Sequence, residues 1–178
     1  MNSAASARRD ALLATAAFSV ALLSGMKWRV DNWSVSWPLV VYYAVLMFST
    51  FFSIRFFCQY IRITLAQRVA DAAFIMCYFY MAWQLNHPLR FALAAAVLFG
   101  VSVVKYRLAE PFFPYPATLR RKIKANSWGA AAAIAAAIGV RAGYSRPSLL
   151  VWIGAFTLAN IYFIWGAPLF RLSSDKQG

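Results

Sequence analysis

The apolar stretch WPLVVYYAVLMFSTFFSIRFF, residues 37–57, determines the fold class. Arg55 is the only charged residue in it. The hydrocarbon layer of a bilayer is about 30 Å thick and needs about 20 helical residues at 1.5 Å each, which this stretch provides. It therefore predicts a membrane-spanning helix, and Pro38 is expected at its start because proline is tolerated in a first helical turn.

Further apolar runs lie on both sides of this stretch. We expect six transmembrane helices, at residues 11–26, 37–57, 65–85, 89–104, 126–140 and 149–166. Thr64 followed by Gln67 predicts a capped start for the third helix. The first run could instead be a cleaved signal peptide or an interfacial segment, which would leave five spans. The expected fold is an all-α membrane bundle that forms a single domain over residues 1–178.

The whole chain has the composition of a membrane protein. Of its 178 residues, 62% are hydrophobic and 13% are charged, which lies outside the range of ordinary soluble domains. The net charge of +13 could indicate nucleic-acid binding, but the Lys and Arg residues lie between apolar runs rather than along one exposed helix. We therefore expect the lipid bilayer as a partner, and no nucleic acid.

The distribution of basic residues predicts the orientation. Most of the 18 Lys and Arg residues lie on the side of the bundle that holds both termini and a long basic loop at 105–124. The other side holds only Lys27, Arg29, Arg90, Arg141 and Arg146. Basic residues favour the cytoplasm, so both termini and the loop are expected there. The compact chain, rich in alanine and arginine, suggests a bacterial inner membrane.

Asp71 is the only acidic residue within a predicted span. In an antiparallel hairpin of the second and third spans, Arg55 and Asp71 lie at similar depth, so we expect their side chains to pair. Two roles for Asp71 stay open at this point. It could neutralise Arg55, or Arg68 on its own helix, or it could be a carboxylate that handles protons or cations.

Two further polar residues lie near the middle of the last span. Thr157 and Asn160 are three residues apart and therefore share a helix face. Asn160 could line a substrate path, or it could hydrogen-bond to a neighbouring helix. The sequence alone does not separate these roles.

The fifth span combines a basic entry with a face of small residues. The basic residues before it are expected to contact anionic lipid headgroups: Arg120, Arg121, Lys122 and Lys124. Gly129, Ala133 and Ala137 recur every four residues, a spacing that lets helix backbones approach closely. That face could pack inside the bundle or form the contact of a homo-oligomer.

Catalytic and metal sites are disfavoured by the residue types present. His87 is the only histidine, and Cys58 and Cys77 lie in separate apolar runs without CxxC spacing, so we expect no metal and no cofactor. HExxH, GxSxG and a phosphate-binding loop are absent from the sequence, which argues against an enzyme. The favoured function is conduction or translocation of a small solute or ion, and the alternative is a non-catalytic accessory or assembly subunit of a larger membrane complex.

Overall fold

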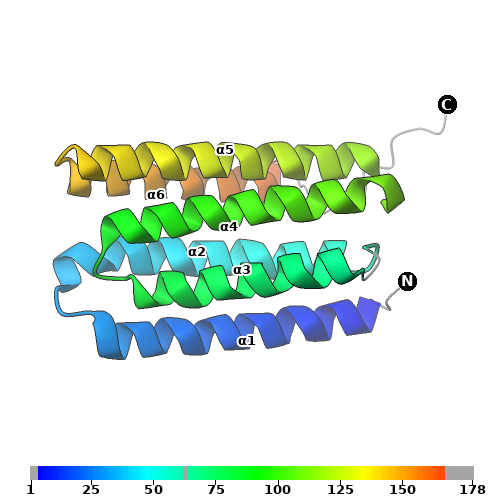
Figure 1. The fold of residues 1–178 in the computed structure, drawn as a ribbon, viewed down its shortest axis with the longest axis horizontal. Helices are drawn as coiled ribbons and strands as arrows, with labels where there is room; N and C mark the ends of the chain where they lie inside the picture. The colour runs from blue at the N-terminus through cyan, green and yellow to red at the C-terminus, as the bar shows by residue number, and fades with distance from the viewer. Residues whose placement is uncertain (1–3, 62–63, 167–178) are drawn as a thin grey trace.

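A computed structural model describes residues 4–61 and 64–166. Helices account for all of the regular structure in these ranges, which contain no strand (Figure 1). The elements in chain order are α1 (Ala4–Arg29), α2 (Trp33–Phe57), α3 (Leu65–Trp83), α4 (Pro88–Ala109), the 3₁₀ turn η1 (Glu110–Phe112), α5 (Pro116–Arg141), α6 (Ser145–Ile161) and the π-helical turn η2 (Tyr162–Gly166). The all-α class and the six helices are thus confirmed.

Five of the helical segments are long and apolar enough to cross a membrane. They are Ala5–Arg29, Trp33–Phe57, Pro88–Phe112, Pro116–Arg141 and Ser145–Gly166. The first helix is among them, although the sequence left its status open. Among the described helices α3 is the one outside this set, because Gln67, Arg68 and Asp71 lower the hydropathy of its first two turns.

Side-chain caps set the starts of α2 and α3. The Asn32 side chain accepts a hydrogen bond from the Ser34 amide at 3.0 Å, so α2 begins at Trp33 and Pro38 lies inside the helix rather than at its start. The expected cap of α3 is confirmed, since the Thr64 hydroxyl accepts from the Gln67 amide at 3.2 Å.

The basic segment 105–124 is mostly helical, not the long loop expected from the sequence. Helix α4 continues to Ala109, η1 follows directly, and α5 begins at Pro116, where a proline suits the first helical position. Only residues 113–115 separate η1 from α5. The basic side chains are therefore held in fixed directions by helical geometry.

The six helices form a closed ring. Going round the ring, each helix packs against the next in the order α1, α2, α6, α5, α4, α3, and α3 packs against α1 again. Helices α2 and α3 are consecutive in the chain, but α1 lies between them in the ring, so they do not form the packed hairpin expected from the sequence. We call the end where α1, α3 and α5 begin the N-terminal end (Figure 1).

Aromatic side chains fill the ring towards the opposite end. Tyr42 packs against Trp152 and Phe91, with ring centroids 4.0 and 5.9 Å away. Tyr78 stacks on Phe18 at 3.9 Å, and its hydroxyl lies 2.5 Å from that of Thr50. We call Phe18, Tyr42, Tyr78, Phe91 and Trp152, which are all buried, the aromatic layer. It closes the interior of the ring from that end.

Candidate functional site

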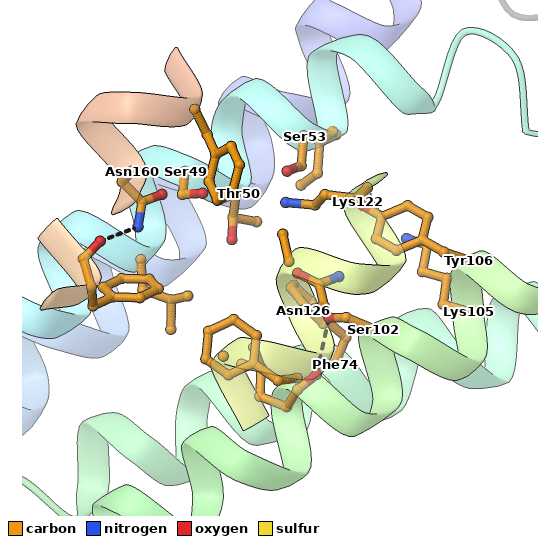
Figure 2. A pocket seen from close by; sticks show the side chains of 18 of the residues that line it. Ser49, Thr50, Ser53, Phe74, Ser102, Lys105, Tyr106, Lys122, Asn126 and Asn160 are labelled. Atoms are coloured by element: carbon orange, nitrogen blue, oxygen red, sulfur yellow. Dashed lines mark hydrogen bonds between the residues drawn. The ribbon is translucent and has the colours of Figure 1, made fainter. Parts of the chain in front are cut away.

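A cavity of about 660 Å³ occupies the half of the ring next to the N-terminal end. All six helices contribute to its wall, because the ring places one face of each towards the centre. Phe18 and Trp152 of the aromatic layer form its floor together with Leu46, Leu98, Phe99 and Phe156. Figure 2 shows the polar side chains that project into it, among them Ser49, Ser53, Ser102, Lys122, Asn126 and Asn160.

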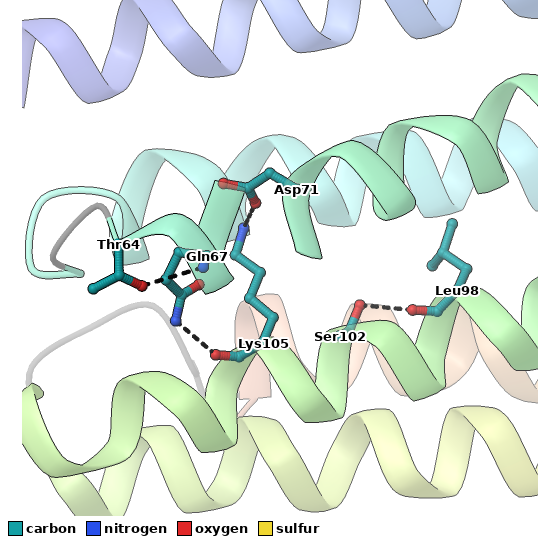
Figure 3. A network of polar contacts seen from close by, with 6 residues as sticks. All are labelled: Thr64, Gln67, Asp71, Leu98, Ser102 and Lys105. Carbon is teal, nitrogen blue, oxygen red and sulfur yellow. Dashed lines mark hydrogen bonds and ion pairs between the residues drawn. The ribbon is translucent and has the colours of Figure 1, made fainter. Parts of the chain in front are cut away.

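The ion pair expected between Arg55 and Asp71 is replaced by another. Asp71 pairs with Lys105 of α4 (Figure 3), whereas the Arg55 side chain is exposed on α2. The cause is the ring order, since α3 packs along α4. Its side-chain contacts with α2 are those that Tyr78 makes in the aromatic layer, towards the other end of the bundle from Asp71. The prediction failed because Lys105 was assigned to a loop, while α4 in fact carries it one residue past the apolar run.

Neighbouring hydrogen bonds hold this ion pair in place. The Gln67 side-chain amide donates to the Lys105 carbonyl at 3.0 Å, which ties the first turn of α3 to α4. The Lys105 side chain is 14% exposed and the Asp71 side chain 50% exposed. The lysine ammonium is thus the more deeply buried member of the pair, and both residues line the cavity wall.

Lys122 differs from the other three basic residues expected at the lipid surface. Arg120, Arg121 and Lys124 are exposed, and Arg120 pairs with Glu110 at 2.7 Å. Lys122 is only 8% exposed and lines the cavity. The helical period explains this, because Lys122 lies on the inward face of α5 that also carries the buried residues Leu119, Ile123 and Asn126.

Asn126 is a site residue that sequence reasoning missed. It lies one turn after Lys122 on the same face and is 5% exposed. Within the described part of the chain, its side-chain Nδ2 has no hydrogen-bond partner. Figure 2 shows Lys122 reaching across the cavity towards Ser53 of α2, with Asn126 beside it. The sequence did contain a signal for this residue, because spacings of four and three place Lys122, Asn126 and Gly129 on one helix face. All three line the cavity wall.

The structure separates Thr157 from the central cavity. Thr157 lines a smaller groove between α2 and α6, with Phe48 on the other wall. Asn160 lines both spaces, and its amide donates to the Phe156 carbonyl of its own helix at 2.8 Å rather than to a neighbouring helix.

The small-residue face of α5 packs inside the chain. Ala133 and Ala137 are buried, and α5 packs along α4. A Cβ atom placed on Gly129 would lie 2.9 Å from the Phe99 ring of α4, so glycine is what allows that ring to approach. This face is therefore used for packing between helices, and an oligomer contact would need a different surface.

The cavity offers charge and hydrogen bonds rather than an activated nucleophile. Burial raises the pKa of the Cys58 thiol, which keeps it protonated at neutral pH. Among the described residues, no group of three or more His, Cys, Asp or Glu side chains is arranged to hold a metal ion. The arrangement suits reversible binding of a polar solute beside apolar walls.

Comparison of the chain with models of known protein families, with curated proteins and with solved structures finds no match. The class of protein is indicated by the fold. A bundle with five helices long and apolar enough to span a bilayer is typical of a multi-pass integral membrane protein.

Proposed function

We propose that the chain is a multi-pass inner-membrane protein that translocates a small solute or ion through its central cavity. The supporting observation is the cavity of about 660 Å³ with polar side chains inside a ring of apolar helices. Solute sites in helical transporters lie between helices near the middle of the bilayer, and this cavity ends at the aromatic layer near the middle of the bundle.

The outer surface supports membrane embedding. Large apolar side chains point outward on every helix, and the following are all more than half exposed: Leu13, Val20, Leu23, Phe48, Met76, Val97, Ile138, Val151 and Leu158. Apolar surface in water costs about 25 cal/mol per Å², and soluble monomers rarely expose it over so many elements. Lipid is the solvent that removes this cost.

Helix α3 is proposed as the sixth span although its average hydropathy is low. Gln67 is buried, and Asp71 is paired with Lys105, so these polar groups are directed to the interior. Its exposed side chains include Val69, Met76 and Phe79. A helix in a ring needs an apolar outer face only, so its average hydropathy underestimates its fit to lipid.

The proposed orientation places the N-terminal end of the bundle in the cytoplasm. The exposed basic residues of that end include Arg8, Arg9, Arg55, Arg68, Arg120, Arg121 and Lys124. Their excess over the opposite end supports this direction, and contact with anionic headgroups would contribute roughly 1 kcal/mol for each residue near the surface. The cavity then opens towards the cytoplasm.

Solute flux into proteoliposomes tests the function. A panel of radiolabelled small anions, cations and neutral solutes is presented to the purified protein, and uptake is compared with protein-free liposomes. Ala132 lines the floor half of the cavity, so Ala132→Trp is expected to reduce uptake to the protein-free rate by filling the path. The matched control is Ala131→Trp, which changes the adjacent exposed residue outside the cavity and should leave uptake unchanged.

The alternative function gives a different result in the same preparation. If no solute of the panel enters and the protein copurifies with one stoichiometric membrane partner, it is an accessory or assembly subunit. Equal loss of uptake in both tryptophan variants would also contradict a path through the cavity.

A further inference from the structure

The charged side chains around the cavity balance one another. Among the described residues, two carboxylates, Asp10 and Asp71, and two ammonium groups, Lys105 and Lys122, line it. Asp71 and Lys105 already form an ion pair on the wall. An ion that entered would lose its hydration in a space whose charges sum to zero, with no net opposite charge to offset that loss. The charge balance therefore favours a ligand without net charge.

Uncharged polar side chains are spread over the cavity wall. They come from every helix between α2 and α6, and Figure 2 shows several that project inward from different sides. Hydroxyl and amide side chains can both donate and accept hydrogen bonds, so a ligand in this space meets hydrogen-bonding groups in many directions. These side chains include Ser49, Ser53, Gln67, Ser102, Asn126 and Asn160.

Three of these side chains use a donor for a bond within the protein and keep an oxygen that can accept. The Ser102 hydroxyl and the Asn160 amide donate to backbone carbonyls four residues earlier in their own helices, at 2.9 and 2.8 Å. The Gln67 amide donates to the Lys105 carbonyl at 3.0 Å. Hydroxyl and amide oxygens have lone pairs for further bonds. The wall thus suits a ligand that brings donors of its own.

Gln67 and Asn126 each bury a polar atom that has no partner. The two residues are 3% and 5% exposed, and among the described residues neither the Gln67 Oε1 acceptor nor the Asn126 Nδ2 donor makes a hydrogen bond. The last torsion of an amide side chain is broad, so either atom can turn towards the cavity. A hydroxyl group both donates and accepts, so ligand hydroxyls can satisfy both kinds of atom.

The floor of the cavity requires an apolar part in the same ligand. Phe18, Phe99, Phe156 and Trp152 line it there. The volume of about 660 Å³ lies within the roughly 300–1,000 Å³ that small-molecule sites occupy. A ligand that fills this space therefore has room for an apolar face or group beside its hydroxyls.

We infer that the cavity binds an uncharged, hydroxyl-rich organic solute, with its hydroxyl groups among Gln67, Ser102 and Asn126 and an apolar part on the aromatic floor. This inference rests on the proposed function and deepens it, since the ligand would be the translocated solute. It predicts the charge, the chemical groups and the orientation of that solute.

Equilibrium binding of radiolabelled phenyl β-glucoside tests the inference. The full chain is placed in nanodiscs of zwitterionic lipid, prepared without sugar detergents that could occupy the cavity. We expect saturable binding. Phenyl β-glucuronide and phenyl 6-amino-6-deoxy-β-glucoside differ from the probe only at the sixth sugar carbon, where they carry a negative and a positive charge. Each should displace the probe only at concentrations at least tenfold higher than unlabelled phenyl β-glucoside requires.

Asn126→Leu removes the unpaired donor with little change of shape. It should weaken binding of phenyl β-glucoside by about fivefold, the change that corresponds to one neutral hydrogen bond, and Gln67→Met should have a similar effect. Thermal unfolding of ligand-free Asn126→Leu should be no easier than that of the native protein, because no bond within the chain is lost. Ser127→Ala is the control, since Ser127 is exposed beside Asn126 and outside the cavity; its affinity should be unchanged.

Four results would each overturn the inference. They are absence of saturable binding of phenyl β-glucoside, tighter binding of either charged analogue, native affinity in both Asn126→Leu and Gln67→Met, and a loss in Ser127→Ala equal to that in Asn126→Leu. The two cavity variants come from different helices, so misfolding of one leaves the other as a test.

Binding and flux can fail independently. Saturable binding that depends on Asn126, without uptake of phenyl β-glucoside into proteoliposomes, would support the ligand class and contradict translocation of this ligand. Uptake of an ion without binding of phenyl β-glucoside would support translocation and contradict the ligand class.

Discussion

Gly25→Ala is expected to destabilise the bundle by roughly 3 kcal/mol, the upper part of the usual range for overpacking. Gly25 is buried in α1, where a Cβ atom would overlap the Ala82 backbone carbonyl of α3. A backbone carbonyl in a helix cannot rotate away as a flexible side chain can, so α1 and α3 would have to separate. Thermal unfolding in detergent measures the effect.

Gly100→Ala is the control for this substitution. Gly100 lies in the middle of α4, and a Cβ atom there would meet nothing within 4 Å. Alanine forms helix better than glycine by about 1 kcal/mol, so this variant should be at least as stable as the native protein. If Gly25→Ala is tolerated equally well, the close approach of α1 to α3 does not exist.

Asp71→Leu is expected to cost about 3 kcal/mol, the low end for breaking a buried ion pair. It leaves the Lys105 ammonium, whose side chain is 14% exposed, without its partner. Lys105→Met should cost less, about 1 kcal/mol as for a partly solvated hydrogen-bonded charge, because the Asp71 side chain is half exposed. The double variant should lose less than the sum, since it leaves no charge unpaired.

Arg55→Leu tests whether Asp71 pairs with Lys105, as in the structure, or with Arg55, as the sequence led us to expect. Arg55 is exposed and lies on α2, so its loss should change stability little and should add to that of Asp71→Leu. Stability is compared in the same detergent for the native protein, the three single variants and the two double variants, Asp71→Leu with Lys105→Met and Asp71→Leu with Arg55→Leu. The ring order would be contradicted if the stability losses of Asp71→Leu and Lys105→Met simply added up while those of Asp71→Leu and Arg55→Leu did not.

Local features of the fold could be predicted from the sequence. The apolar runs locate the helices because each helix must satisfy its own backbone in lipid, and the Thr64 cap is a contact over three residues. The start of α2 was missed because Asn32 caps the helix five residues before the expected start at 37. The end of α4 was missed because a helix can continue beyond its apolar run when its polar residues face partners or solvent.

The ring order and the site could not be predicted in the same way. They depend on which helices pack together, and contacts such as Tyr42 with Trp152 join residues far apart in the chain. The pairing of Asp71 with Lys105 follows from that order. The inward direction of Lys122 could have been read from the helical period, but only once residues 116–124 were assigned to a helix rather than to a loop.

The central cavity should be reached by water from the cytoplasmic side and be closed by the aromatic layer from the other side. Cysteine accessibility tests this most directly, in a background where Cys58 and Cys77 are replaced by serine and alanine. Ser49→Cys places a thiol on the cavity wall, and Ser34→Cys places one at the exposed start of α2, at the opposite end of the bundle. A membrane-impermeant thiol reagent reaches the cytoplasmic face in inside-out vesicles, where it should modify Ser49→Cys. It reaches the outer face in intact cells, where it should modify Ser34→Cys. Modification of Ser49→Cys mainly from outside the cell, or from neither side, would contradict a membrane-spanning bundle with a cavity open to the cytoplasm.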